Sequence, residues 1–142
     1  MEQLELLLNK YKFELRPKPL EQGILEAIPF QLPDDYKFYL ENYEAFEGSI
    51  GNEYVQFWKT DELLEANQGY GIAKYLPNVF GIGGNGGGEF IGIEFLSNRY
   101  HRIILSDLVS LEEEYFIEIG TSFQICLSDW IMAENGLTKI EQ

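Results

Sequence analysis

The 142-residue sequence has few of the residues on which many protein functions depend. It contains one cysteine, Cys126, and one histidine, His101. A single cysteine cannot form an intrachain disulfide, which is typical of a reducing compartment. One Cys and one His also leave a zinc site short of its usual ligands. No apolar run approaches the about 18 residues that a membrane-spanning helix needs, and the acidic N-terminus lacks the positive charge of a signal peptide. We therefore expect a cytoplasmic protein without a metal site.

Positive charge is scarce as well. Ten Lys and Arg stand against 24 Asp and Glu, which gives a formal net charge of −14. Proteins that bind nucleic acids need clustered Lys and Arg to neutralise phosphates, and anionic membranes attract basic segments. The composition therefore argues against nucleic-acid and membrane partners. It leaves a basic protein as the complementary partner, with plain solubility as the simpler explanation of the charge.

Apolar residues nevertheless make up 45% of the sequence and aromatic residues 15%, which predicts a folded core rather than a disordered acidic chain. Three segments are apolar at positions i, i+3, i+4 and i+7, the spacing of an amphipathic helix. Their stripes are Leu4, Leu7, Leu8 and Tyr11; Tyr36, Tyr39, Leu40 and Tyr43; and Phe123, Cys126, Leu127 and Trp130. Residues 13–20 are expected to form an extended connector, because they contain Pro17 and Pro19. Shorter helical pieces are expected at 24–28 and 60–67.

The middle of the chain has a different pattern, in which apolar and polar residues alternate. This period predicts strands at 53–58, 90–95 and 100–105, and residues 78–82 and 115–119 are further strand candidates. Ser97 and Asn98 supply a tight turn between two of these strands. Helices come first, strands in hairpins follow, and a helix ends the pattern. The order predicts an α+β fold, a single domain over residues 1–142 with a central, mainly antiparallel sheet flanked by N-terminal and C-terminal helices.

The most distinctive stretch is a run of glycines at 81–88. Gly81, Gly83 and Gly86 formally match the dinucleotide-binding pattern G-x-G-x-x-G. That site requires a helix directly after the loop, whereas residues 89–93 alternate as a strand. Glu89 would also repel a phosphate, and the Lys of a P-loop is missing. The run therefore indicates a hairpin connection in which at least one of residues 86–88 adopts a positive φ.

Several motifs of this sequence resemble a known family. Residues 32–40 are similar to its opening leucine-proline motif and amphipathic helix, the glycine run into 89–91 to its central motif, and residues 122–127 to its closing serine-phenylalanine helix. Trp58 and residues 60–63 resemble the segment between the first two. On these motifs the chain resembles the SUKH superfamily over about residues 22–132. Asn85 stands where that family often has Asp, and residues 111–120 match it poorly.

The resemblance implies an α+β fold and a non-enzymatic role without a cofactor. Bacterial members of the superfamily are immunity proteins that bind and neutralise secreted toxins, often nucleases or deaminases, and fungal members are cell-wall regulators. The expected partner is therefore a toxin protein, and the alternative is a general interaction or scaffold module. The residues themselves select no catalytic centre. His101 lies in a strand pattern, and Cys126 lies on an apolar helix stripe, where a thiol is inert. An enzyme that acts through carboxylates remains a third possibility, although nothing selects a pair.

The acidic residues suggest where a partner would bind. No Lys or Arg occurs between Ile103 and Thr138, a span that contains seven acidic residues. A solvated surface would explain this run, and so would a docking face for a basic toxin. Aromatic residues in loops beside the acids are candidates too, because Tyr is enriched at binding hot spots. The first candidates for partner binding are Glu112, Glu113, Glu114, Glu118, Tyr115 and Tyr70. The second candidates are Asp34, Asp35, Glu47, Glu53 and Glu89.

Overall fold

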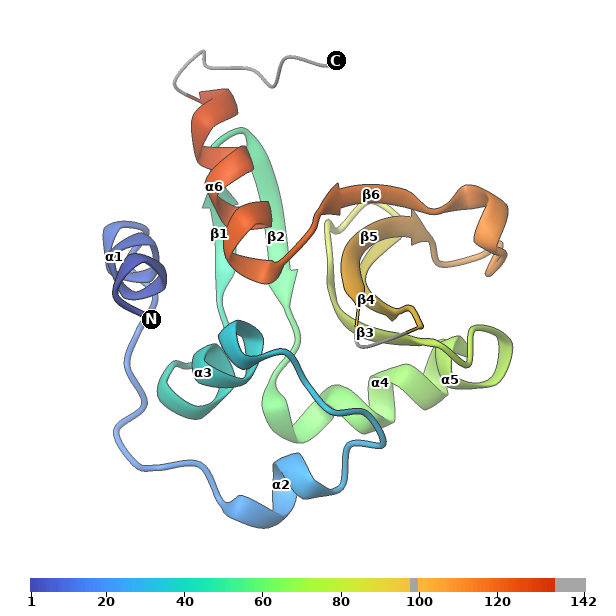
Figure 1. Ribbon diagram of the computed structural model, residues 1–142, viewed down its shortest axis with the longest axis horizontal. Coiled ribbons are helices and arrows are strands. Elements are labelled where there is room, and N and C mark those ends of the chain that lie inside the picture. Colours follow the sequence, from blue (N-terminus) through green and yellow to red (C-terminus); the bar gives the residue numbers. More distant parts are fainter. Residues whose placement is uncertain (98–99, 135–142) are drawn as a thin grey trace.

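The computed structural model describes residues 1–97 and 100–134, which form six α-helices, two short 3-10 turns and six strands (Figure 1). The helices are α1 (Glu2–Lys10), α2 (Gln22–Glu26), α3 (Asp34–Asn42), α4 (Leu63–Gly69), α5 (Ile72–Tyr75) and α6 (Phe123–Glu134). The 3-10 turns are η1 (Thr60–Glu62) and η2 (Glu113–Tyr115). The strands are β1 (Glu47–Ile50), β2 (Glu53–Phe57), β3 (Val79–Gly84), β4 (Glu89–Phe95), β5 (His101–Asp107) and β6 (Ile117–Gly120).

All six strands belong to one antiparallel sheet, whose spatial order follows the order of the chain. The predicted α+β class with flanking terminal helices is therefore confirmed. Strands β3 to β6 curl into a C, whereas the β1–β2 hairpin extends away from them toward α6 (Figure 1). This split occurs because β2 pairs with β3 at only two positions, Gln56 with Gly84 and Phe57 with Gly83.

Two hydrophobic clusters cover the two faces of the curled part of the sheet. On β4 and β5 successive side chains point to opposite faces. Ile91 and Ile103 belong to the main core, which the predicted stripes of α1, α3 and α6 complete. Phe90 and Ile104 belong to a second cluster with Ile72 of α5. Because both faces are covered, the central strands are buried almost throughout.

Local signals in the sequence set the helix ends. Pro33 precedes α3, and Asp34 and Asp35 lie in its first turn, where negative charge complements the helix dipole. The Ser122 hydroxyl accepts a hydrogen bond from the backbone N–H of Ile125 at 3.1 Å and so caps the start of α6. Asp35 adds a second cap to that helix, because its carboxylate accepts the backbone N–H of Gln124 at 2.9 Å. One acidic residue thus joins the two helices.

The strands agree less closely with the sequence pattern. Strand β1 was not predicted, because its sequence Glu-Gly-Ser-Ile contains a single large apolar residue, Ile50, and its other evidence is the pairing with β2. Strand β6 begins at Ile117 rather than at Tyr115, which lies in η2. The turn predicted at Ser97 and Asn98 falls partly outside the described residues. The residues on either side of this turn are hydrogen-bonded to each other, because the Leu96 N–H donates to the Tyr100 carbonyl at 2.8 Å.

The glycine run has two structural roles. Its first part lies inside β3, where a side chain at Gly83 would collide with the backbone carbonyl of Gln56 in β2. Its second part is the hairpin loop to β4, in which Gly86 and Gly88 have φ of 76° and 93°. The expected positive φ and the hairpin are thus confirmed. The strand that follows the loop leaves no helix N-terminus there to hold a phosphate.

Candidate functional site

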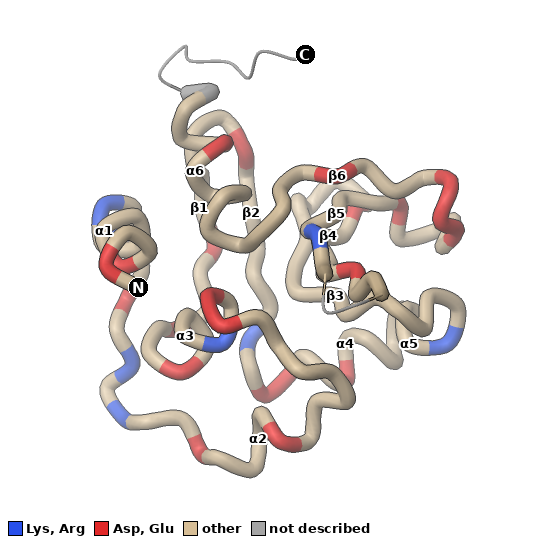
Figure 2. Tube along the Cα trace, viewed as in Figure 1, with Lys and Arg blue, Asp and Glu red and all other residues tan. Residues whose placement is uncertain are grey.

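The segment that joins β5 to β6, residues 108–116, is here called the acidic loop. Three of its apolar side chains, Leu108, Leu111 and Phe116, pack against the second hydrophobic cluster. This anchoring turns the intervening residues outward, and Glu112, Glu113, Glu114 and Tyr115 are all exposed. The anchored loop thus presents three consecutive carboxylates at the open end of the curl, where acidic positions gather in Figure 2.

The acidic loop also meets the corner between α4 and α5. Gly71, which forms that corner with a φ of 84°, leaves room for Leu111. A Cβ on this glycine would lie 3.4 Å from a Leu111 methyl group and 3.3 Å from the Tyr75 ring. Tyr70, the preceding residue, is half exposed and stacks on Trp58 with ring centroids 5.5 Å apart. The fold therefore places Tyr75 beside the acidic loop, while Tyr70 stacks on Trp58 next to the same corner.

Exposed apolar side chains accompany these acids. Val109 is 89% exposed and Tyr115 is 45% exposed. Large apolar groups left in water beside polar ones are typical of interaction surfaces. We call this surface the acidic face. It consists of Tyr70, Tyr75, Val109, Glu112, Glu113, Glu114, Tyr115 and Glu118.

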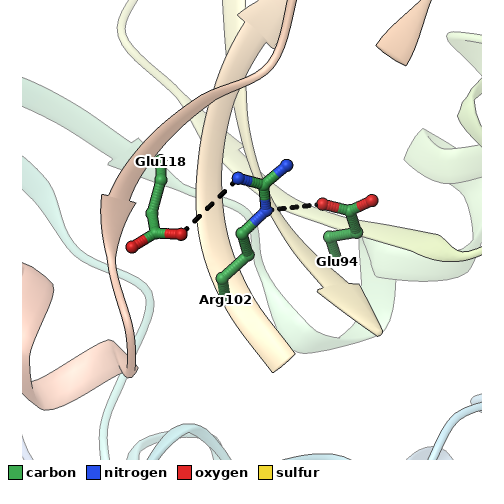
Figure 3. A network of polar contacts seen from close by, with 3 residues as sticks. All are labelled: Glu94, Arg102 and Glu118. Atoms are coloured by element: carbon green, nitrogen blue, oxygen red, sulfur yellow. Dashed lines mark hydrogen bonds and ion pairs between the residues drawn. The ribbon is translucent and has the colours of Figure 1, made fainter. Parts of the chain in front are cut away.

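A three-residue ion-pair network crosses the sheet beside the acidic face (Figure 3). Arg102 of β5 donates from Nε to a Glu94 carboxylate oxygen of β4 at 2.6 Å and from Nη1 to Glu118 of β6 at 3.5 Å. The hydrogen bond to Glu94 is the largest cause that raises the pKa of the Arg102 guanidinium above its ordinary value. Two carboxylates share one guanidinium, so the network retains a net negative charge.

The acids of the acidic loop itself have no such compensation. Among the described residues, none of Glu112, Glu113 and Glu114 forms an ion pair. A basic residue, Lys74, lies in α5, where its ammonium sits 5.2 Å from the centroid of the Tyr75 ring. The acidic loop therefore presents three carboxylates without an ion-pair partner among the described residues, together with exposed apolar groups.

The second group of candidate residues lies elsewhere and has largely local partners. Asp34 is exposed on α3 and Asp35 caps α6. Glu47 accepts a hydrogen bond from the Tyr54 hydroxyl, which lowers the pKa of its carboxyl group, and Glu53 begins β2. Glu89 accepts from the Asn85 amide at 2.9 Å within the β3–β4 hairpin. The fold thus keeps the acidic-loop candidates and Glu118 close together along the chain, places Tyr70 at the neighbouring α4–α5 corner, and disperses the second group.

The sequence interpretation missed Glu94 and Arg102. A signal for them was present, because the two residues are equally far from Asn98 in the predicted turn. Antiparallel strands joined by such a turn bring these positions opposite each other, as the observed register does.

The single cysteine and the single histidine both lie in the described part of the fold. Cys126 is buried on the α6 stripe, and the Nε2 atom of His101 is buried without a hydrogen-bond partner among the described residues. Over the same residues no group of three or more His, Cys, Asp or Glu is placed to hold a metal ion. None of the described helices has the length and apolar character that crossing a bilayer requires. No protein-family model and no curated protein sequence matches this chain.

Proposed function

We propose that this protein is a cytoplasmic binding protein whose acidic face docks a basic partner protein. The resemblance of its motifs to the SUKH superfamily makes a bacterial toxin, a nuclease or deaminase, the first candidate for that partner. Binding would cover the toxin and neutralise it without any chemistry by this chain. One observation carries the proposal: the anchored acidic loop holds exposed, uncompensated carboxylates next to exposed apolar side chains.

The physics of such a surface suits a basic partner. Proteins that act on nucleic acids carry positive charge because they bind phosphates. Complementary charge steers diffusional encounter and raises the association rate, an effect that salt screens. Apolar and aromatic groups then supply the short-range contacts that hold the complex, since hot spots are rich in Tyr. The acidic face contains both kinds of group within one surface.

The experiment is a pull-down of the tagged chain from its native host at low salt, followed by mass spectrometry. The wild type is compared with the triple variant Glu112→Lys, Glu113→Lys and Glu114→Lys. In a matched control, three exposed glutamates in or next to α2 and α3 are changed to lysine: Glu21, Glu26 and Glu41. The control has the same change in net charge as the acidic-loop variant. We expect the control to retain a basic partner that the acidic-loop variant loses. Retention of that partner by both variants would refute the assignment of the acidic face.

The second candidate function, a regulatory scaffold like the fungal members, is separated from immunity by a growth assay. If the captured partner stops growth when it is expressed alone and this chain restores growth, the chain is an immunity protein. If the partner is harmless and several cellular proteins are captured, the scaffold function is favoured. The gene next to that of this chain offers a simple check, because a long secreted protein with a variable C-terminal domain accompanies immunity.

A further inference from the structure

Strand β6 forms one edge of the sheet. It pairs with β5 on one side, and among the described residues no strand pairs with it on the other side. In Figure 1 β6 runs along the outer rim of the curl, and no described helix or strand lies outside it. An edge strand carries unpaired N–H and C=O groups, which can bind an added strand from another chain.

The bonding pattern of the neighbouring strands shows which groups of β6 are unpaired. Leu108 donates its N–H to the Gly88 carbonyl at 2.9 Å, so the peptide groups of even-numbered residues of β5 point to β4. Those of odd-numbered residues, such as Leu105, point to β6. Ile117 lies opposite Leu105 and therefore directs its N–H and C=O to β5. Glu118, the next residue, directs its N–H and C=O away from the sheet.

Side chains on one face of the sheet form a row whose charge changes sign from strand to strand (Figure 3). Glu94 of β4 pairs with Arg102 of β5 at 2.6 Å, and Arg102 reaches Glu118 of β6 at 3.5 Å. The row ends at the Glu118 side chain, which is 45% exposed at the open edge. Opposite charges on neighbouring strands stabilise the pairing of the strands, and like charges destabilise it. The next position of the row therefore suits a Lys or an Arg.

Ile117 determines what suits the other face at this edge. Successive side chains of a strand point to opposite faces, so the Ile117 side chain points away from the row of charges. It is 56% exposed, and an apolar residue of an added strand would cover it. The edge thus favours a strand in which basic and apolar residues alternate. A second copy of this chain does not fit, because its β6 edge would bring further glutamates instead of a base.

We propose that the outer side of β6 is a docking edge, to which an extended segment of the partner protein adds as a seventh strand with a Lys or Arg opposite Glu118. This inference rests on the proposed function and specifies how a basic partner would be held. The acidic loop leads directly into β6 and would attract further basic residues at one end of the added strand. The β1 edge has no comparable signal, because both ion pairs of the described residues lie on β4, β5 and β6.

The test uses a short peptide as the added strand. An end-capped pentapeptide in which valine and lysine alternate, with valine at both ends, is titrated into the full isotope-labelled chain at constant ionic strength. The control peptide has glutamate in place of lysine. By NMR we expect saturable amide shifts at residues 116–120 with the lysine peptide and none with the glutamate peptide. Hydrogen exchange of the Glu118 N–H should be faster than that of the Ile117 N–H in the free chain and should slow when the lysine peptide binds.

Backbone methylation decides whether the peptide binds as a strand. A lysine opposite Glu118 exchanges both backbone hydrogen bonds with that residue, so its N–H faces β6, whereas the valine N–H groups face away. N-methylation of the two lysines is expected to abolish the saturable shifts. N-methylation of the two valines that follow them is expected to leave binding nearly unchanged. Equal effects of the two methylations would show that charge attraction alone holds the peptide, and would overturn the proposal.

Two variants of equal charge test the row of charges. Glu118→Gln removes its last carboxylate, and Glu114→Gln removes an exposed carboxylate of the acidic loop. Both side chains are exposed, so the fold is expected to survive both changes. Glu118→Gln should weaken binding of the lysine peptide by up to about fivefold, as loss of an opposite-charge pair across two strands does. Glu114→Gln should weaken it by less than about twofold, as a screened surface charge does.

Three other results would refute the docking edge. They are equal weakening by the two variants, the absence of saturable shifts with the lysine peptide, and shifts at residues 116–120 that depend on protein concentration without any peptide. The last result would show that a second copy of the chain occupies the edge.

The outcome separates this inference from the proposed function. If the lysine peptide adds as a strand and no basic partner is captured in the pull-down, the docking edge stands and the proposed function fails. If a basic partner is captured but its complex neither shifts residues 116–120 nor protects the Glu118 N–H from exchange, the function stands and the docking edge is refuted.

Discussion

Asn67 of α4 carries the sharpest prediction about what holds the curled sheet to its helices. The residue is 3% exposed, and its side chain satisfies both backbone groups of Gly81 in β3. The Asn67 amide donates to the Gly81 carbonyl at 3.0 Å, and its oxygen accepts the Gly81 N–H at 2.7 Å. Because the ladder between β2 and β3 extends only over Gly83 and Gly84, Gly81 lies beyond it. The side chain of Asn67 therefore takes the place of a neighbouring strand.

The perturbation is Asn67→Leu, which preserves the approximate volume and removes all hydrogen bonding. Two buried backbone groups of Gly81 lose their side-chain partner, and each unsatisfied group costs about 1–3 kcal/mol. Leucine recovers part of this loss, because a buried apolar side chain contributes about 1.5–3 kcal/mol relative to an exposed one. We expect a net loss of about 2 kcal/mol in the free energy of unfolding. That is a large share of the about 5–15 kcal/mol that stabilises a typical domain.

The assay is urea unfolding at pH 7, followed by tryptophan fluorescence and analysed by linear extrapolation. The control is Gln68→Leu, the next residue along α4, which is exposed and forms none of these bonds. Its effect should stay within about 0.5 kcal/mol, as is usual at such surface sites. If Asn67→Leu lay within about 1 kcal/mol of wild type with an unchanged slope, the Gly81 groups would have found other partners and the reasoning would be wrong.

Two further predictions concern the ends of the sheet. Gly86→Ala should lower the free energy of unfolding by about 1–2 kcal/mol, because the φ of 76° at this position strains any residue with a Cβ. The control Gly87→Ala should be nearly neutral, since Gly87 has no positive φ. Equal effects of the two variants in urea unfolding would contradict this prediction. The Tyr54 hydroxyl lowers the pKa of Glu47 in the folded state, so this interaction stabilises the fold at pH values above the unfolded pKa and is lost as the pH falls through the folded pKa. In Tyr54→Phe we expect NMR titration to show a higher Glu47 pKa, and an unchanged value would exclude the hydroxyl as the cause.

The helices could be predicted because a single helix displays its buried face in its own sequence. Tyr36, Tyr39 and Leu40 are spaced to share one face of α3, and all three are buried. Strand β1 gives a weaker signal, because Ile50 is the one residue of its four that is buried in the main core, and the strand is defined mainly by its pairing with β2. Periodicity therefore identifies elements that show several buried positions and misses a short strand that shows one.

The candidate site was predictable only in part. That the three consecutive glutamates lie in a connection between two strands follows from the pattern around them. That the α4–α5 corner at Gly71 meets this connection through Leu111 does not, because that contact depends on how far the sheet curls. Glu94 was predictable in part. Its pairing with Arg102 follows from the hairpin register, whereas its burial depends on Phe116 and α5, which cover that face of the sheet.

The fold also divides the negative charge into two kinds. Asp35, Glu89 and Glu94 accept hydrogen bonds that cap a helix, close a hairpin and link two strands, so they have structural partners. The glutamates of the acidic loop have none of these roles among the described residues. Solubility alone would be served equally well by charges on a loosely held, fully polar loop. Instead this loop is fixed through Leu111 and Phe116, and it exposes Val109 and Tyr115 to water at an energetic disadvantage. A partner would cover the exposed apolar groups of this surface and pair with its carboxylates. The arrangement therefore favours binding over solubility as the reason for the composition of the surface.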